Sequence, residues 1–201
     1  MKKLVIALML ASLIAGCVQM SAEEIAKKMQ EKEEQIEDLR AEVLAVTESP
    51  LGEFKQSYTY VFKKPYKIYM ESENFITVSN GSVMWSYDKI NNKVMVLESN
   101  FSNREPIKLD YTEIIKDLLE RYDVQLLGEE KVSGRDCYVL NLKPKGDEGN
   151  VTKMWVDKEF WFPVKMEYKF GEFSMFIEYR NLSFNNGIDD SFFEFKPPER
   201  C

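Results

Sequence analysis

From residue 45 onward the chain alternates apolar and polar side chains, with turn signals every eight to twelve residues. Tyr58, Tyr60 and Phe62, for example, alternate with Thr59 and Val61, which face the other way, before Pro65 breaks the run. A period of two residues is typical of a strand with one buried face, and short turns favour antiparallel pairing. The pattern predicts an antiparallel meander.

The alternation extends to the end of the chain. Asn80-Gly81 is a strong signal for a tight hairpin turn between two early strands. The later strands are expected at residues 124–127, 137–142, 151–156, 164–170, 173–184 and 192–195. We count about ten or eleven strands, and so many antiparallel strands curl into a barrel or half-barrel instead of staying flat.

Two segments have the helical period instead. In residues 21 to about 43, Ser21 and Glu24 form a capping-box pattern, and apolar residues recur at spacings of three, four and seven. Residues 111–122 carry a second apolar stripe. Strands in long runs with two segregated helices predict an α+β fold in which the helices pack on the sheet.

The composition excludes several functions. The chain has no histidine, which removes Ser-His and Cys-His catalysis and HExxH zinc sites, and it has no GxSxG, Walker A or clustered metal-ligand motif. The acidic pairs Glu129-Glu130 and Asp189-Asp190 follow or join expected turns, where carboxylates are usually solvated. A net charge of -7 gives nucleic acid little to bind. We expect a monomeric binding protein that is not an enzyme and uses no cofactor, metal or nucleic acid.

The N-terminus has the pattern of an export signal. Two lysines precede an apolar run at residues 4–14 that is too short to span a bilayer. The run ends in Ile14-Ala15-Gly16-Cys17, which resembles the lipobox of secreted lipoproteins. This predicts a signal peptide at 1–16, a lipidated N-terminus and linker at 17–20, and a domain at 21–201 on the outer face of a membrane. The alternatives are an ordinary signal peptide cut near Ala15 and, less favoured, an uncleaved anchor.

Cysteine usage agrees with export. If Cys17 carries lipid, Cys137 and Cys201 remain, an even pair in an oxidising compartment. The pair predicts a disulfide that ties the C-terminal tail to a strand. The alternative is one buried thiol and one free terminal thiol.

One face of the last strands is apolar throughout. Methionine and aromatic side chains adapt to ligands of varied shape, and two short helices cannot cover the whole concave side of so wide a sheet. The uncovered part predicts a ligand cavity, although these side chains also suit an ordinary core. The candidate cavity residues are Tyr60, Phe62, Met70, Trp85, Met166, Tyr168, Met175 and Ile177.

Several motifs occur together in an order that one known family shares. Residues 79–88 are similar to the "ngk.lW.Yd" hairpin of the LolA/LolB lipoprotein carriers, and residues 61–65 to the basic-Pro break that precedes it there. Further matches occupy residues 134–140, 155–165 and 193–198. In order and spacing the resemblance covers about residues 21–198, which is essentially the whole predicted domain.

The resemblance implies an unclosed antiparallel half-barrel, with helices as a lid over a hydrophobic cavity that takes the acyl chains of lipids or lipoproteins. Lys64 occupies the position before Pro65 where soluble carriers usually have an arginine that helps to hold the empty lid shut, which implies lid control by Lys64. Lysine lacks the planar fork of arginine, so control of the lid is expected to differ. The implied function is carriage or sorting. The alternative is a sensor similar to RseB, or a structural envelope lipoprotein without transfer activity.

Overall fold

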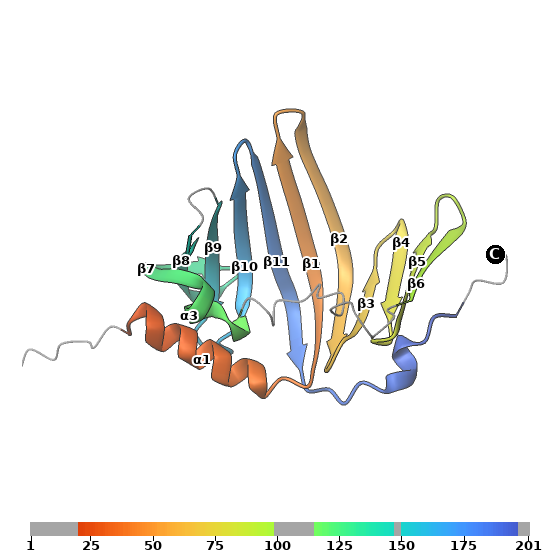
Figure 1. Ribbon diagram of the computed structural model, residues 1–201, viewed down its shortest axis with the longest axis horizontal. Helices are drawn as coiled ribbons and strands as arrows, with labels where there is room; N and C mark the ends of the chain where they lie inside the picture. Colours follow the sequence, from red (N-terminus) through yellow and green to blue (C-terminus); the bar gives the residue numbers. More distant parts are fainter. Residues whose placement is uncertain (1–19, 99–114, 147–149, 197–201) are drawn as a thin grey trace, which may run out of the picture.

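The computed structural model describes residues 20–98, 115–146 and 150–196 (Figure 1). Its strands are β1 Asp38–Ser49, β2 Gly52–Lys63, β3 Lys67–Glu71, β4 Phe75–Ser79, β5 Val83–Asp88, β6 Lys93–Glu98, β7 Tyr122–Val132, β8 Arg135–Pro144, β9 Asn150–Asp157, β10 Pro163–Phe170 and β11 Phe173–Phe184.

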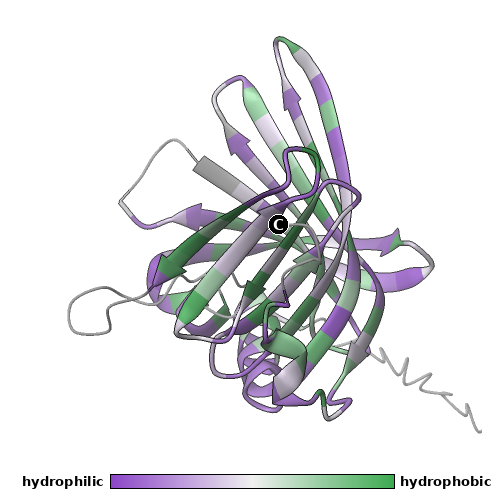
Figure 2. Cartoon of the chain, turned by 90° about the vertical axis from the view of Figure 1, so that its right-hand side faces the viewer, coloured by the Kyte–Doolittle hydropathy of each residue, from purple (hydrophilic) through white to green (hydrophobic). Residues whose placement is uncertain are grey.

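These strands form one antiparallel sheet. The order of the eleven strands is β6-β5-β4-β3-β2-β1-β11-β10-β9-β8-β7, so β6 and β7 lie at opposite edges and do not close a barrel. Figure 2 shows the sheet curving, with hydrophobic and hydrophilic bands alternating along its strands. The predicted α+β fold, an unclosed antiparallel half-barrel with few helices, is confirmed.

Helix α1, Ala22–Glu34, begins at the predicted capping box. The Ser21 hydroxyl accepts a hydrogen bond from the Glu24 backbone NH at 3.1 Å, and the Glu24 carboxylate accepts one from the Ser21 NH at 2.8 Å. The prediction that this helix continues to residue 43 is wrong, because β1 starts at Asp38. Leu39 and Val43 are four residues apart and both buried, a spacing that fits a strand as well as a helix.

Two further expectations concern short segments. Residues 115 and 116 and α3, Leu118–Arg121, are helical, whereas residues 111–114 of the predicted second helix lie outside the described residues. The strand predicted at 192–195 is wrong, since Asp190–Phe193 forms the 3-10 helix η1. The Asp189 carboxylate accepts a hydrogen bond from the Ser191 NH at 2.8 Å, which favours a turn over an extended backbone.

Helix α1 covers one end of the concave face (Figure 1). Its buried side chains Ile25, Ala26 and Met29 share a hydrophobic cluster with Ile115 and Leu118 and with inward-facing residues of β1, β2 and β8–β10. In the described part of the chain, no helix is long and apolar enough to cross a membrane.

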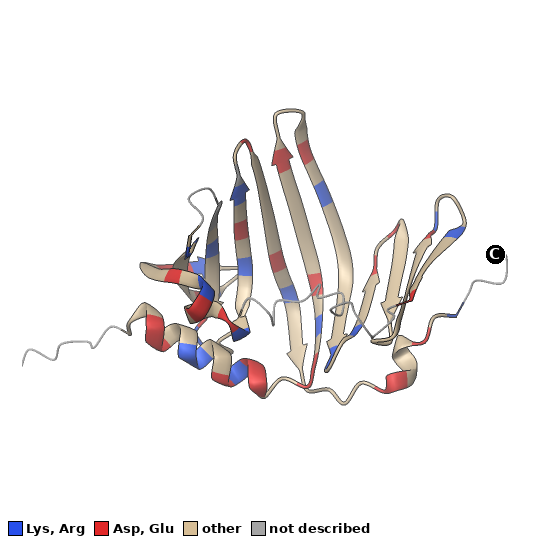
Figure 3. Cartoon of the chain, viewed as in Figure 1, with Lys and Arg blue, Asp and Glu red and all other residues tan. Residues whose placement is uncertain are grey.

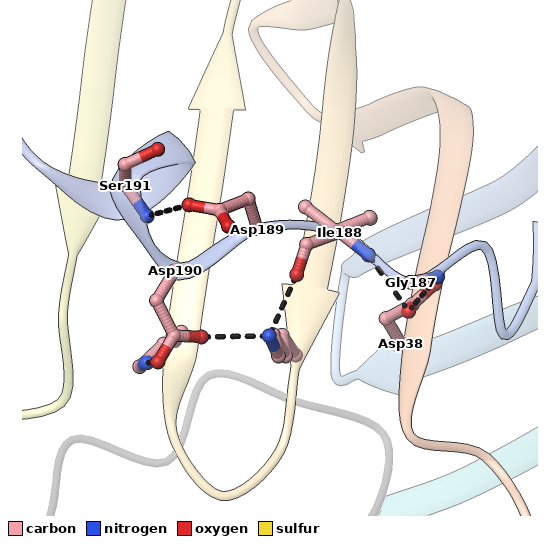
Figure 4. A network of polar contacts seen from close by, with 8 residues as sticks. Asp38, Gly187, Ile188, Asp189, Asp190 and Ser191 are labelled. Carbon is pink, nitrogen blue, oxygen red and sulfur yellow. Dashed lines mark hydrogen bonds and ion pairs between the residues drawn. The ribbon is translucent and has the colours of Figure 1, made fainter.

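The segment after β11, residues 185–196, lies against the convex face, and we call it the strap. Phe193 is fully buried there against Val61 and Val78. Figure 4 shows the polar contacts that hold the strap, and two carboxylates, those of Asp38 and Asp190, make most of them.

Asp38 is buried and accepts three backbone hydrogen bonds from the strap. The donors are the NH groups of Asn186 at 2.7 Å, Gly187 at 2.8 Å and Ile188 at 3.2 Å. They fix the start of the strap to the start of β1.

Asp190 bridges two lysines. Its carboxylate lies 2.6 Å from the Lys63 amino group and 2.5 Å from that of Lys67. Hydrogen bonds from these lysines lower the pKa of Asp190 to about 2. The bridge fixes η1 to β2 and β3.

Candidate functional site

The concave face is identified by pairing register, because paired residues of neighbouring strands lie on the same side of a sheet. Tyr60 of β2 pairs with Met70 of β3. The even-numbered residues of β2, Tyr60 among them, pair with odd-numbered residues of β1 such as Ala45, and Ala45 pairs with Ile177 of β11. Ile177 in turn pairs with Met166 of β10. Seven of the eight candidate cavity residues therefore share this face: Tyr60, Phe62, Met70, Met166, Tyr168, Met175 and Ile177.

Trp85 does not share the concave face. Its partner in β4 is Val78, whereas the residue that continues the concave row from Met70 is Thr77. Trp85 lies on the convex face, where its ring stacks on Phe195 of the strap with centroids 6.2 Å apart. Its assignment to the concave face is wrong, because alternation within one strand leaves open which face the next strand presents.

Exposure of the concave face increases with distance from α1. Phe62, Met166 and Tyr60 are buried, at 1%, 2% and 4% exposure, while Met175 and Ile177 are half-buried. Phe54 and Phe173, nearer the tips of the β1–β2 and β10–β11 hairpins, are 64% and 53% exposed. The apolar surface therefore extends beyond the part that α1 covers.

Two tyrosines on the concave face, Tyr58 and Tyr168, have raised pKa values. Burial raises the pKa of Tyr168 to about 12 and also raises the pKa of Tyr58. The Tyr168 hydroxyl donates a hydrogen bond to the Met166 sulfur at 3.2 Å, a weak acceptor. Both rings pack against the hydrophobic cluster, so the inner part of the concave face is largely apolar.

Lys64 contacts the C-terminal end of α1. Its amino group donates hydrogen bonds to the carbonyl oxygens of Glu33 at 2.8 Å and Glu34 at 3.2 Å, and lies 3.3 Å from the Glu33 carboxylate. A cation is favourable at a helix C-terminus, where carbonyl groups lack helical partners. The structure thus joins the residue implied in lid control to the helix that covers the concave face.

Asn185 holds the residues that follow α1. Its side-chain amide donates to the Gln35 carbonyl at 2.9 Å, and its side-chain oxygen accepts from the Glu37 NH at 2.8 Å. Sequence reasoning missed this contact and the role of Asp38, because the partners are about 150 residues apart. The two asparagines that follow β11 indicate a turn in the sequence, but nothing in the sequence indicates which residues they contact.

Of the three cysteines, the structure describes only Cys137. Cys17 and Cys201 lie outside the described residues, and the pairing of Cys137 with Cys201 stays a prediction. Cys137 is buried and has no disulfide partner among the described residues, and its thiol donates to the Arg135 carbonyl at 3.6 Å. Burial, together with the nearby Asp157 carboxylate, raises the pKa of Cys137 to about 11, so this thiol is a poor nucleophile.

The acidic pairs have structural partners. Glu130 accepts a hydrogen bond from the Trp155 indole at 2.7 Å, and Glu129 lies 2.5 Å from the Lys158 amino group. Residues 20–98, 115–146 and 150–196 contain no group of three or more acidic or cysteine side chains placed to hold a metal ion. These carboxylates stabilise local structure.

The sequence of the chain matches a known protein family. A family model described as "Uncharacterized protein" matches residues 55–170, more than half of the chain. The chain belongs to this family. Uncharacterized protein MJ0687 from Methanocaldococcus jannaschii is 41% identical over 187 residues, which cover 92% of the chain and 54% of that relative. The chain thus spans about half the length of the curated relative that it matches.

A solved structure shares the architecture. An uncharacterized conserved protein from Thermus thermophilus aligns with a TM-score of 0.57 at 11% identity, covering 87% of this chain and 95% of that one. LolA superfamily protein NE2245 from Nitrosomonas europaea aligns with a TM-score of 0.41 at 15% identity, covering 88% and 99%. The unclosed half-barrel implied by the LolA-like sequence motifs is the fold observed.

Proposed function

We propose that this chain is an exported lipoprotein, held through Cys17 on the outer face of a cell membrane, that binds acyl chains of lipids or lipoproteins for carriage or sorting. The supporting observation is the gradient of exposure on the concave face, from buried Phe62 to exposed Phe54 and Phe173. A mainly apolar surface, interrupted by Gln56 and Thr47 and covered only in part by its own helix, suits a long, flexible apolar ligand.

The energetics agree with reversible binding. Burial of one methylene contributes about 0.8 kcal/mol, so ten methylenes contribute about 8 kcal/mol before ordering costs are subtracted. The remainder corresponds to micromolar or weaker affinity, roughly what a protein that must release its ligand needs. Met70, Met166 and Met175 adapt to chains of different length because methionine is unbranched and flexible.

In this proposal α1 is the lid and Lys64 restrains it. A ligand that reaches the inner residues, such as Tyr60 and Met166, must share space with the buried side chains of α1. The two hydrogen bonds from Lys64 to the last carbonyl groups of α1 favour the closed arrangement. A lysine makes this restraint less directional than an arginine, which presents a rigid fork of donors.

Binding of acyl probes tests the function. The delipidated Cys17→Ser protein is expected to bind labelled fatty acids of ten to eighteen carbons saturably. Affinity should rise by up to about fourfold per added methylene until the face is filled. Fluorescence titration measures each affinity. Failure to bind at every chain length would refute the function even though the fold is correct.

The anchor is tested in cells. Cys17→Ser is expected to move the protein from the membrane fraction to soluble or uncleaved forms, because the serine hydroxyl cannot accept the thioether-linked lipid. Fractionation and the mass of the mature protein measure the change. A mature mass and membrane fraction identical to those of the wild type would contradict lipidation at Cys17.

A further inference from the structure

Strand β2 extends well past its neighbour β3. It pairs with β1 along its whole length, from Gly52 to Lys63, but with β3 only from Thr59 to Lys63. Residues 52–58 therefore pair with no described strand on the β3 side, and Figure 1 shows the β1–β2 hairpin rising above β3–β6. At about 3.3 Å per residue, this free edge is roughly 23 Å long.

The register shows which backbone groups face outward. The Lys64 NH donates to the Glu37 carbonyl at 2.9 Å, which continues the pairing of β2 with β1. Because alternate residues of a strand direct NH and C=O to opposite neighbours, even-numbered residues of β2 face β1. Glu53, Lys55 and Ser57 then direct their backbone donors and acceptors away from the sheet, as an edge strand does.

The two sides of this edge differ in chemistry. On the concave side, Phe54 is largely exposed and Tyr58 lies near Phe75, with ring centroids 6.2 Å apart. On the convex side, Glu53 and Lys55 form an ion pair at 2.8 Å, and Figure 3 shows an acidic and a basic band on the upper part of β2. An added strand would thus meet the rings of Phe54 and Tyr58, with Gln56 between them, on one face and charged groups on the other.

A cavity of about 330 Å³ opens at the lower end of the edge, beside Ser57 and Thr59. Its lining includes the carboxylates of Glu42, Glu71 and Glu73 and one guanidinium, that of Arg180. Arg180 makes two hydrogen bonds to Glu178, at 2.9 and 3.0 Å, so its charge is already compensated. Glu71 is likewise paired, with Lys89 at 2.9 Å, so Glu42 and Glu73 give the cavity its negative charge. The cavity therefore favours a cationic side chain.

We propose that the free edge of β2, from Glu53 to Ser57, binds an extended peptide as an added strand. Its occupant is the polypeptide attached to the acyl chain of an acylated partner protein. This rests on the proposed function, since an acyl chain on the concave face beside Phe54 and Tyr58 brings its attached peptide to this edge. Backbone pairing accepts many sequences, with a preference for alternating apolar and polar residues and a lysine or arginine over the acidic cavity.

The test compares two probes on the delipidated Cys17→Ser protein. One is labelled palmitate, and the other is the same acyl chain attached to a hexapeptide of alternating valine and serine with one lysine. The acyl-peptide is expected to bind about tenfold more tightly, because backbone hydrogen bonds add to the acyl contacts. Ser57→Pro removes an outward NH and should erase this gain without changing palmitate affinity, whereas Ser57→Ala keeps the NH and the gain.

The outcomes separate the two proposals. Palmitate binding with no gain for the acyl-peptide, or a gain that persists in Ser57→Pro, would overturn the edge site and leave the proposed function standing. Binding of neither probe would overturn both. If thermal melting shows that Ser57→Pro fails to fold, an acyl-peptide N-methylated at alternate residues gives the same test on the unsubstituted edge, and it must lose the tenfold gain.

Discussion

Met175→Glu is expected to weaken acyl-probe binding by a hundredfold or more, an effect of about 3 kcal/mol, while the domain stays folded. Met175 lies on the concave face, pairs with Tyr168 and Thr47, and is half-buried. A carboxylate there meets water or becomes protonated in the unliganded protein, so the fold tolerates it. A bound acyl chain removes that water, and the charge must then be buried without a partner. Probe titration and thermal melting measure the two effects.

Val46→Glu is the matched control. Val46 is also half-buried and pairs with Phe176, the neighbour of Met175, but it lies on the convex face. This variant should bind acyl probes as the unsubstituted protein does. If Met175→Glu unfolds the domain, the concave face is a filled core and the cavity interpretation is wrong; wild-type binding by Met175→Glu would contradict it equally.

Asp38→Ala is expected to lower the free energy of unfolding by about 3 kcal/mol or more. The substitution leaves the NH groups of Asn186, Gly187 and Ile188 without their buried acceptor. An unsatisfied buried donor costs about 1 to 3 kcal/mol, and hydrogen bonds to a charged acceptor are the stronger kind. Urea denaturation measures the change, and hydrogen exchange should show faster exchange in the strap than in β8 and β9.

Asp88→Ala supplies the comparison. The Asp88 carboxylate also accepts backbone hydrogen bonds, from Ile90 at 2.9 Å and Asn91 at 3.0 Å, but in a solvent-accessible turn. Water replaces the lost acceptor there, so the loss of stability should be much smaller. Equal losses in the two variants would show that burial of Asp38 does not determine its contribution.

The strands were largely predictable from sequence because each has one buried face, and a period of two carries that information locally. The end of α1 was not. Ile36, Leu39 and Val43 continue the helical spacing of Ile25 and Met29, yet the last two face the core from a strand. A four-residue interval satisfies both periods, so only the tertiary pairing of β1 with β2 and β11 decides between them.

The site was predictable in composition but not in full arrangement. Seven concave residues follow from alternation, whereas Trp85 required the register across the hairpin at Asn80. Phe193 lies in a segment that reads as a strand, but the neighbouring Asp189 and Asp190 find partners that stabilise a turn. Lys64 was identified only through the family resemblance, since no local pattern joins it to a helix about thirty residues earlier.

The contacts at the two ends of α1 are unequal. Lys64 and Asn185 hold its C-terminal end through backbone hydrogen bonds, whereas near its N-terminus Met20 accepts one weak hydrogen bond, from Tyr138 at 3.8 Å. A displacement that keeps the C-terminal contacts must turn about residues 34–37. With α1 about 20 Å long, a rotation of 20° moves Met20 by about 7 Å. In the proposed function α1 would therefore act as a lever, and the buried side chain of Ile25 would have to leave the hydrophobic cluster when it turns. The moving arm begins three residues after Cys17, so a membrane anchor there would pull on the lid at its point of greatest leverage.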